Sequence, residues 1–202
     1  MITWIIIGIT GLTSYLAFQN NSLMDKLQFN AAQVVHRKQY YRMISHAFIH
    51  VGWMHLLVNM MVLYFFGPYV EETFSYHFGN KGTLYYLLLY LGGILISNTW
   101  SLIRHKDDYY YNAVGASGAV SAVLFTFIFL RPWEMLYLFA IVPIPGIIFA
   151  VGYLIYSYQM GKRRSDNIAH DAHFLGAVFG FVFPIILKPE LFRQFIEHLP
   201  NI

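Results

Sequence analysis

The sequence predicts an all-α membrane protein, a single domain over residues 1–202 with six transmembrane helices and a long interfacial first loop. Of its residues, 57% are hydrophobic and only 11% are charged, whereas soluble proteins carry about 25% charged residues. So few charges do not cover a water-facing surface, and a mean hydropathy of +0.49 indicates the lipid bilayer as the solvent. The absence of cysteine excludes disulfides and thiolate metal sites.

Six apolar segments are candidates for the spans, because a helix needs about 20 mostly apolar residues to cross the hydrocarbon core. They cover residues 2–18, 51–69, 83–103, 113–130, 135–158 and 169–187. The first segment lacks the basic start and the small-residue cleavage site of a signal peptide, so we expect it to stay in the mature protein. In the fifth, Pro143 and Pro145 are unfavourable inside a helix, so the regular helix is expected to begin near Pro145.

The connection between the first two spans, residues 19–50, is unusually long and mixes apolar with basic side chains, which is typical of an interfacial element. The Lys and Arg residues divide unevenly between the two sides of the membrane. The side of the termini holds Lys81, Arg131, Lys188 and Arg193, and the other side holds Lys26, Arg37, Lys38, Arg42, Arg104, Lys106, Lys162, Arg163 and Arg164. By the positive-inside rule, this distribution predicts termini that face outward. Basic residues confined to loops also give no reason to expect a nucleic-acid partner.

Polar side chains inside predicted spans are costly in lipid, so they indicate candidate functional sites. His55 and Asn59 lie at the start of the second span and are four residues apart. On a helix they share one face, and both could donate hydrogen bonds to the same point. Hydrogen bonding between helices explains this pair equally well.

A second group is the Gly115-Ala-Ser117-Gly118 stretch at the mouth of the fourth span. A serine flanked by glycines can expose both its hydroxyl and its backbone N–H, which is the geometry that a nucleophile needs. Small residues are also common where membrane helices pack, and Gly118 with Ala122 forms such a contact face by itself.

A third group opens the sixth span, where Gly176 and Gly180 allow another helix to approach closely and His173 lies near the same face. If the partner is the small-residue face of the fourth span, His173 can reach Ser117 and act as its general base. Asp171 lies roughly 200° around the helix from His173 and points elsewhere. The residues therefore predict a Ser–His dyad for acyl transfer.

In order and spacing, these motifs resemble the rhomboid intramembrane serine proteases in their compact six-helix bacterial form. The family pattern is an Arg in the first loop, then H-x4-H-x3-N, G-x-S-G and A-H-x2-G-x3-G. The matching residues are Arg42, His50, His55, Asn59, Gly115, Ser117, Gly118, Ala172, His173, Gly176 and Gly180.

The resemblance implies that Ser117 is the nucleophile and His173 the base. It implies an oxyanion hole made by His55, Asn59 and the Ser117 N–H. Arg42 and His50 would be structural residues of the first loop. The same resemblance implies that Glu71 closes the second span by capping nearby backbone groups.

One departure concerns the residue one turn after the nucleophile, which is a tyrosine stacked on the catalytic histidine in some members of the family. This chain has Ser121 there, which cannot stack. His173 would then be held by apolar packing or by a residue that the sequence does not identify.

The resemblance implies an endopeptidase that cleaves transmembrane segments of other membrane proteins within the lipid bilayer. No cofactor and no metal are expected. The expected location is the inner membrane of a bacterium, with the active site open to the outer face, which is opposite to the orientation that the Lys/Arg distribution predicts. Substrates would enter beside the fifth span and the loop of residues 159–168, which are the expected movable parts.

Two alternatives remain. The first is a proteolytically silent rhomboid-like protein that binds membrane clients. The second is a metal transporter or metalloprotease that uses the histidines, but the chain has no H-E-x-x-H motif, and His170, Asp171 and His173 form a poor set of ligands without others.

Overall fold

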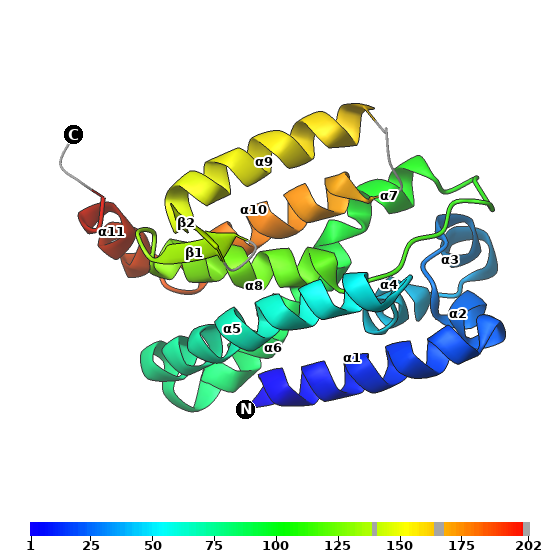
Figure 1. Cartoon of the computed structure of the whole chain (residues 1–202), viewed down its shortest axis with the longest axis horizontal. Coiled ribbons are helices and arrows are strands. Elements are labelled where there is room, and N and C mark those ends of the chain that lie inside the picture. The colour runs from blue at the N-terminus through cyan, green and yellow to red at the C-terminus, as the bar shows by residue number, and fades with distance from the viewer. Residues whose placement is uncertain (139–140, 164–167, 200–202) are drawn as a thin grey trace.

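The long helices form one bundle (Figure 1). The structure is a computed structural model and describes residues 1–138, 141–163 and 168–199. They run alternately in opposite directions (Figure 1). α8 is central, because every residue from Gly118 to Phe129 is buried, and an apolar helix that is covered on all sides belongs in a core. The bundle consists of α1 (Ile2–Gln19), α5 (Trp53–Phe78), α6 (Gly82–Ser97), α8 (Ser117–Leu130), α9 (Gly146–Arg163) and α10 (His170–Leu187).

Several of these helices have the length and composition of membrane spans. Among the described residues, three helical stretches could cross a membrane on these grounds: Ile2–Gln19, Trp53–Arg104 and His170–Leu187. The second is 52 residues long and contains α5 and α6, which turn back on one another near Gly79 (Figure 1). Ser117–Leu130 is a shorter apolar helix. The prediction of a helical membrane bundle is confirmed, and the count of six spans stays a prediction.

Some boundaries differ from the predicted ones. α5 continues to Phe78, well past the predicted end at residue 69. α6 ends at Ser97 and is followed by the separate short helix α7 (Thr99–Arg104). α8 begins at Ser117 instead of residue 113, because backbone hydrogen bonds to the first loop hold residues 113–115 outside the helix.

The first loop is ordered, and Arg42 ties it together. It contains α2 (Asn21–Leu27), α3 (Ala31–Arg37), α4 (Arg42–Ser45) and the 3₁₀ turn η1 (His46–Phe48). Arg42 is only 5% exposed. Its Nη1 donates to the carbonyls of Asp25 (2.7 Å) and Gln28 (2.6 Å), and its Nε donates to Gln39 Oε1 (2.6 Å). The guanidinium thus satisfies carbonyls at the end of α2 and joins α2 to α4.

A β-hairpin precedes α9, and the all-α expectation did not include it. β1 (Met135–Leu138) pairs antiparallel with β2 (Val142–Pro145), with Met135 opposite Pro145. The hairpin has only two strands, so both are edge strands, where prolines are tolerated. α9 then begins at Gly146, directly after the predicted start near Pro145.

A second unpredicted element is α11 (Glu190–Glu197), which covers the end of α8. Its buried residues Leu191 and Phe195 are four apart and therefore share one face. The Phe195 ring stacks on Phe129 of α8 with centroids 5.2 Å apart.

The turn between α5 and α6 is tight. After the 3₁₀ turn η2 (Gly79–Lys81), Gly82 packs directly on the backbone of α5.

Glu71 caps the start of α1 from the middle of α5. The side chain is 4% exposed. Its carboxylate accepts hydrogen bonds from the backbone N–H groups of Ile2 (2.7 Å) and Thr3 (3.0 Å) and from the Thr3 hydroxyl (2.8 Å). The first N–H groups of a helix have no partner within it, and negative charge is favourable there. Glu71 is therefore a capping residue, but of the first helix, and α5 continues beyond it.

The substitution Glu71→Ala is expected to lower the melting temperature, because it leaves buried N–H groups of α1 unsatisfied, at a cost of about 2 kcal/mol. Thermal unfolding in detergent would measure this. The neighbouring Glu72 is exposed, so Glu72→Ala is the matched control and should leave the melting temperature unchanged. Equal effects of the two substitutions would contradict the capping role.

Candidate active site

The backbones of α8 and α10 touch at their small residues. A Cβ added to Gly176 would collide with the carbonyl oxygen of Gly118, and one added to Gly180 would collide with that of Ala122. The Thr126 hydroxyl also donates to the Gly180 carbonyl at 2.7 Å. The predicted small-residue faces of these two helices therefore meet directly.

This contact brings the predicted nucleophile and base to one cavity of about 1050 Å³, which Ser117, His173 and His55 all line. His173 is one turn before Gly176, and Ser117 directly precedes Gly118, so the helix contact sets their relative position. Ser117 is the first residue of α8, and its backbone N–H has no carbonyl partner within the helix. That N–H, at the positive end of the helix dipole, suits a developing negative charge.

Gly115 fits the loop before Ser117 against His55. Its φ of 117° lies in the region that favours glycine, and an added Cβ would come within 2.5 Å of His55 Cε1. The Gly115 N–H donates to the carbonyl of His46 at 2.9 Å. The segment before Ser117 is thus hydrogen-bonded to the first loop of residues 19–50. His55 packs against Gly115, where a larger residue would leave no room.

His50 connects three parts of the structure at this point. Its Nε2 accepts from the Ala116 N–H at 3.3 Å, and its Nδ1 lies 3.0 Å from the Ser14 hydroxyl of α1. Its ring also meets the edge of His55, with centroids 4.8 Å apart. Since Nε2 accepts, Nδ1 carries the proton and donates to Ser14. His50 therefore supports the loop before Ser117 and the ring of His55.

Two histidines of the first loop are held neutral. Burial lowers the pKa of His46 to about 4, partly offset by its hydrogen bond to the Met43 backbone. Burial, together with the charges that His55 and His46 would carry, lowers the pKa of His50 to about 3. The Asn98 amide donates to His46 Nε2 at 2.6 Å, a bond that the neutral ring accepts and a protonated ring would lose.

Asn59 lies behind His55. It is 4% exposed, and its Nδ2 donates to the His55 carbonyl at 2.8 Å. Asn59 is not among the residues that line the cavity. The structure therefore brings His55 to Ser117 and His173 and leaves the Asn59 side chain outside the cavity wall.

Tyr153 of α9 is a site residue that the sequence did not identify. Its ring stacks on His173, with centroids 6.4 Å apart and planes inclined by 21°. Its hydroxyl lies 2.8 Å from Ser121 Oγ. Tyr153 lies on a different helix from Ser117 and His173, so no local spacing in the sequence could have revealed it.

His170 and Asp171, the neighbours of His173 on α10, also line this cavity. The His170 ring meets the edges of His173 (5.9 Å) and Tyr156 (5.4 Å). Asp171 lies against α9, because a Cβ on Gly161 would come within 2.5 Å of its Oδ1. In the described part of the chain, no group of three or more His, Asp or Glu residues is arranged to hold a metal ion.

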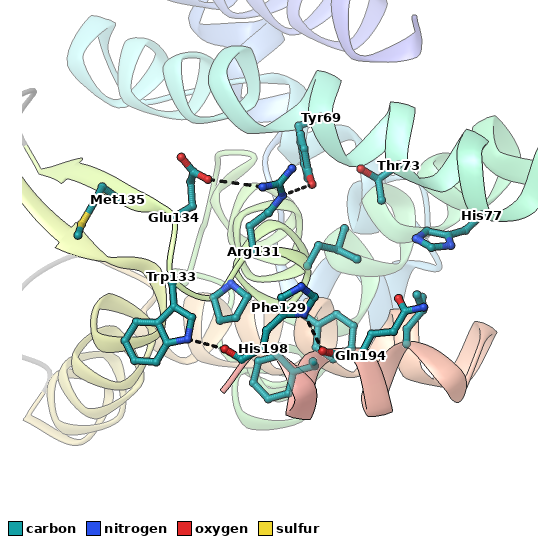
Figure 2. A pocket seen from close by; sticks show the side chains of 14 residues that line it. Tyr69, Thr73, His77, Phe129, Arg131, Trp133, Glu134, Met135, Gln194 and His198 are labelled. Carbon is teal, nitrogen blue, oxygen red and sulfur yellow. Dashed lines mark hydrogen bonds and ion pairs between the residues drawn. The ribbon is translucent and has the colours of Figure 1, made fainter. Parts of the chain in front are cut away.

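A second cavity, of about 650 Å³, lies at the opposite end of α8, roughly 20 Å from the first along that helix. Figure 2 shows the side chains that line it. It lies between α5, the residues after α8, and α11. Figure 2 shows Arg131 directed toward Tyr69, to whose hydroxyl its Nε donates at 2.6 Å. None of the predicted site residues lines this cavity.

Comparison with known proteins identifies the family. The model of the Rhomboid domain matches residues 37–190, which include the cavity residues described above. The chain belongs to the rhomboid family. Rhomboids are generally intramembrane serine proteases, and the chain is a multi-pass membrane protein of this kind of fold.

Similar rhomboid relatives occur in a plant and in a bacterium. "RHOMBOID-like protein 12, mitochondrial" of Arabidopsis thaliana is 33% identical over 166 residues, which are 75% of this chain and 47% of that protein. "RHOMBOID-like protein 2" of the same plant is 32% identical over 78% of this chain and 46% of that protein. "Putative rhomboid protease YdcA" of Bacillus subtilis is 30% identical over 46% of this chain and 42% of that protein.

The chain thus spans about half the length of these rhomboid relatives. The matches support a multi-pass membrane protein. They do not support the expected bacterial inner membrane, because the relatives that match most of the chain are plant proteins, and one of them is mitochondrial by name.

Gly176→Ala is expected to destabilise the protein by about 1–3 kcal/mol, because the new methyl group collides with the Gly118 carbonyl. The melting temperature in detergent would measure this. Gly152 of α9 has no neighbouring atom within 4 Å of an added Cβ, so Gly152→Ala is the control and should be neutral or slightly stabilising. A Gly176→Ala variant as stable as the wild type would contradict the backbone contact.

The protein is expected to lose stability as the pH falls below about 6.5. The pKa values of His46 and His50 are lowered to about 4 and about 3 in the folded state, so the unfolded chain binds more protons between these values and 6.5. Melting temperatures from pH 8 to pH 5 would follow this loss. His46→Gln should flatten the dependence, and His36→Gln at an exposed position should not. An unchanged slope in His46→Gln would contradict the assignment.

Proposed function

We propose that the chain is an intramembrane serine endopeptidase that cleaves transmembrane segments of membrane proteins by a Ser117–His173 dyad. The observation that carries this proposal is that Ser117, His173 and His55 line one cavity. Acyl transfer needs a nucleophile, a base and a donor for the oxyanion, and these residue types meet all three needs.

In the proposed reaction, Ser117 Oγ attacks the scissile carbonyl carbon while His173 takes its proton. The carbonyl oxygen becomes an oxyanion, which the Ser117 N–H and His55 stabilise by donating hydrogen bonds. The His173 imidazolium then protonates the leaving amine, and the peptide bond breaks. Water next attacks the acyl-enzyme, with His173 taking its proton and returning one to Ser117.

Asn59 is proposed as a further oxyanion donor. One of its amide hydrogens is used by the His55 carbonyl, and the other remains for the oxyanion, because an amide nitrogen carries two hydrogens. A rotation of the side chain from its buried position would be needed. Arg42 and His50, with Glu71 and the four glycines at 115, 118, 176 and 180, are proposed as structural support for the dyad.

Substrates are proposed to enter between α9 and α5. The cavity wall includes Met54 and Val58 of α5 and Met160 of α9, which offer apolar contacts to a transmembrane segment. A helical segment hides its carbonyls in hydrogen bonds, so helix-destabilising residues near the cut should favour cleavage. Residues 164–167, in the loop expected to move, lie outside the described residues.

We further propose that the cavity opens to the outer face of the membrane. The contrary Lys/Arg distribution counts Arg42 as a free charge, but Arg42 is buried and binds three acceptors in the first loop. A buried guanidinium that donates to three acceptors is part of the folded loop, so its weight in the positive-inside count is reduced.

The alternative is a proteolytically silent rhomboid-like protein that binds membrane clients. The observation that favours it is the position of Asn59, whose side chain does not line the cavity. Both reacting groups are nevertheless present, and a silent protein would have no need of either.

Ser117→Ala and His173→Ala are each expected to abolish cleavage of a transmembrane test substrate in liposomes, because each removes one half of the dyad. Labelling of Ser117 by a fluorophosphonate should disappear in both variants, while their melting temperatures stay near that of the wild type. Ser75→Ala, in α5 and away from the cavity, is a control that should retain cleavage. A folded wild type that neither cleaves nor labels would favour the client-binding alternative.

A further inference from the structure

Tyr153 joins three helices beside the proposed dyad. It belongs to α9, its ring stacks on His173 of α10, and its hydroxyl lies 2.8 Å from Ser121 Oγ of α8. Two more rings flank it, Phe125 at 5.4 Å and Phe149 at 5.7 Å between centroids. The Tyr153 ring is therefore fixed at its hydroxyl end and on its sides, and one face is directed to His173.

A general base works only if its imidazole is held in one orientation, since a shift of about 1 Å can cost a factor of 100 in rate. The closest acid in sequence, Asp171, lies against Gly161 of α9. The His173 ring stacks with Tyr153 and also meets the edge of His170. The Tyr153 ring lies nearly parallel to the imidazole, with the planes inclined by 21°, and such a neighbour restricts rotation of the imidazole.

We propose that Tyr153 is a positioning residue, which orients the His173 imidazole for proton transfer with Ser117. The inference rests on the proposed function and deepens it. The Ser121 hydroxyl is the anchor of this arrangement, because it is 5% exposed and holds the far end of the Tyr153 side chain.

The placement of Tyr153 on α9 has a mechanical consequence. Only Gly146, Ala150 and Ser157 of this helix are buried, and α9 lies at the outer side of the bundle beside α10 (Figure 1). Moving α9 outward would withdraw the ring from His173. The dyad is therefore fully oriented only while α9 is packed against α8 and α10.

The test measures kcat and KM for cleavage of a transmembrane substrate in liposomes. Tyr153→Met keeps an apolar side chain of adaptable shape but removes the ring. It is expected to lower kcat about 10- to 100-fold, with KM within about twofold of the wild type. Tyr153→Phe keeps the ring and loses the anchor, so kcat should fall only about threefold. The control is Tyr158→Met, at an exposed position of the same helix, which should keep the wild-type kcat.

A Tyr153→Met variant with a wild-type kcat and melting temperature would overturn the inference, and so would a Tyr153→Phe variant as impaired as Tyr153→Met. If Tyr153→Met does not fold, a double-mutant cycle decides. Tyr153→Phe and Ser121→Ala remove the same hydrogen bond, so the double variant should have the kcat of either single variant, and additive losses would overturn the inference. A wild type that neither labels at Ser117 nor cleaves would overturn the proposed function itself, which is a different result.

Discussion

The contact between the backbones of α8 and α10 is the constraint on which the rest of the site depends. Lipid provides no hydrophobic drive for apolar helices to associate, so close packing and hydrogen bonds between them must hold the bundle together. Gly176 and Gly180 meet the carbonyls of Gly118 and Ala122, and Thr126 adds a hydrogen bond to the Gly180 carbonyl. No side chain intervenes at this contact, so the main chains themselves set where His173 stands relative to Ser117.

The first loop adds a second rigid layer at the same end of α8. Arg42 satisfies carbonyls of the loop. The neutral ring of His46 accepts from the Asn98 amide, directly after α6, and that of His50 accepts from the Ala116 N–H. Buried polar groups are costly when they lack partners and order the structure when they are satisfied. The loop therefore fixes the backbone before Ser117 and the ring of His55, although it contains only short helices.

Local spacing explains which features could be predicted from the sequence. The small residues of α10 and the position of His173 follow from helical periodicity, and they meet α8 as expected. The capping of Ile2 by Glu71 joins residues 69 positions apart, and Tyr153 reaches His173 from a different helix, so no spacing rule indicates either contact. Helical periodicity also predicted that Asn59 shares a helix face with His55. In the structure the Asn59 amide donates to the His55 backbone carbonyl, and this local hydrogen bond competes with a hydrogen bond into the cavity.

The site therefore combines a part held by backbone contacts with a helix that is held by few buried residues. Ser117 and the start of α10 are held by backbone contacts, whereas α9 buries few of its residues and carries the Tyr153 ring that stacks with His173. A substrate segment that enters beside α9 must displace apolar contacts of this helix, and a displaced α9 no longer orients the base. Entry and proton transfer then call for different positions of α9. In the proposed mechanism, α9 must pack again on α8 and α10 with the substrate segment bound before the peptide bond is cut. Segments that prevent this packing would bind without being cleaved, so substrates are selected before the chemical step.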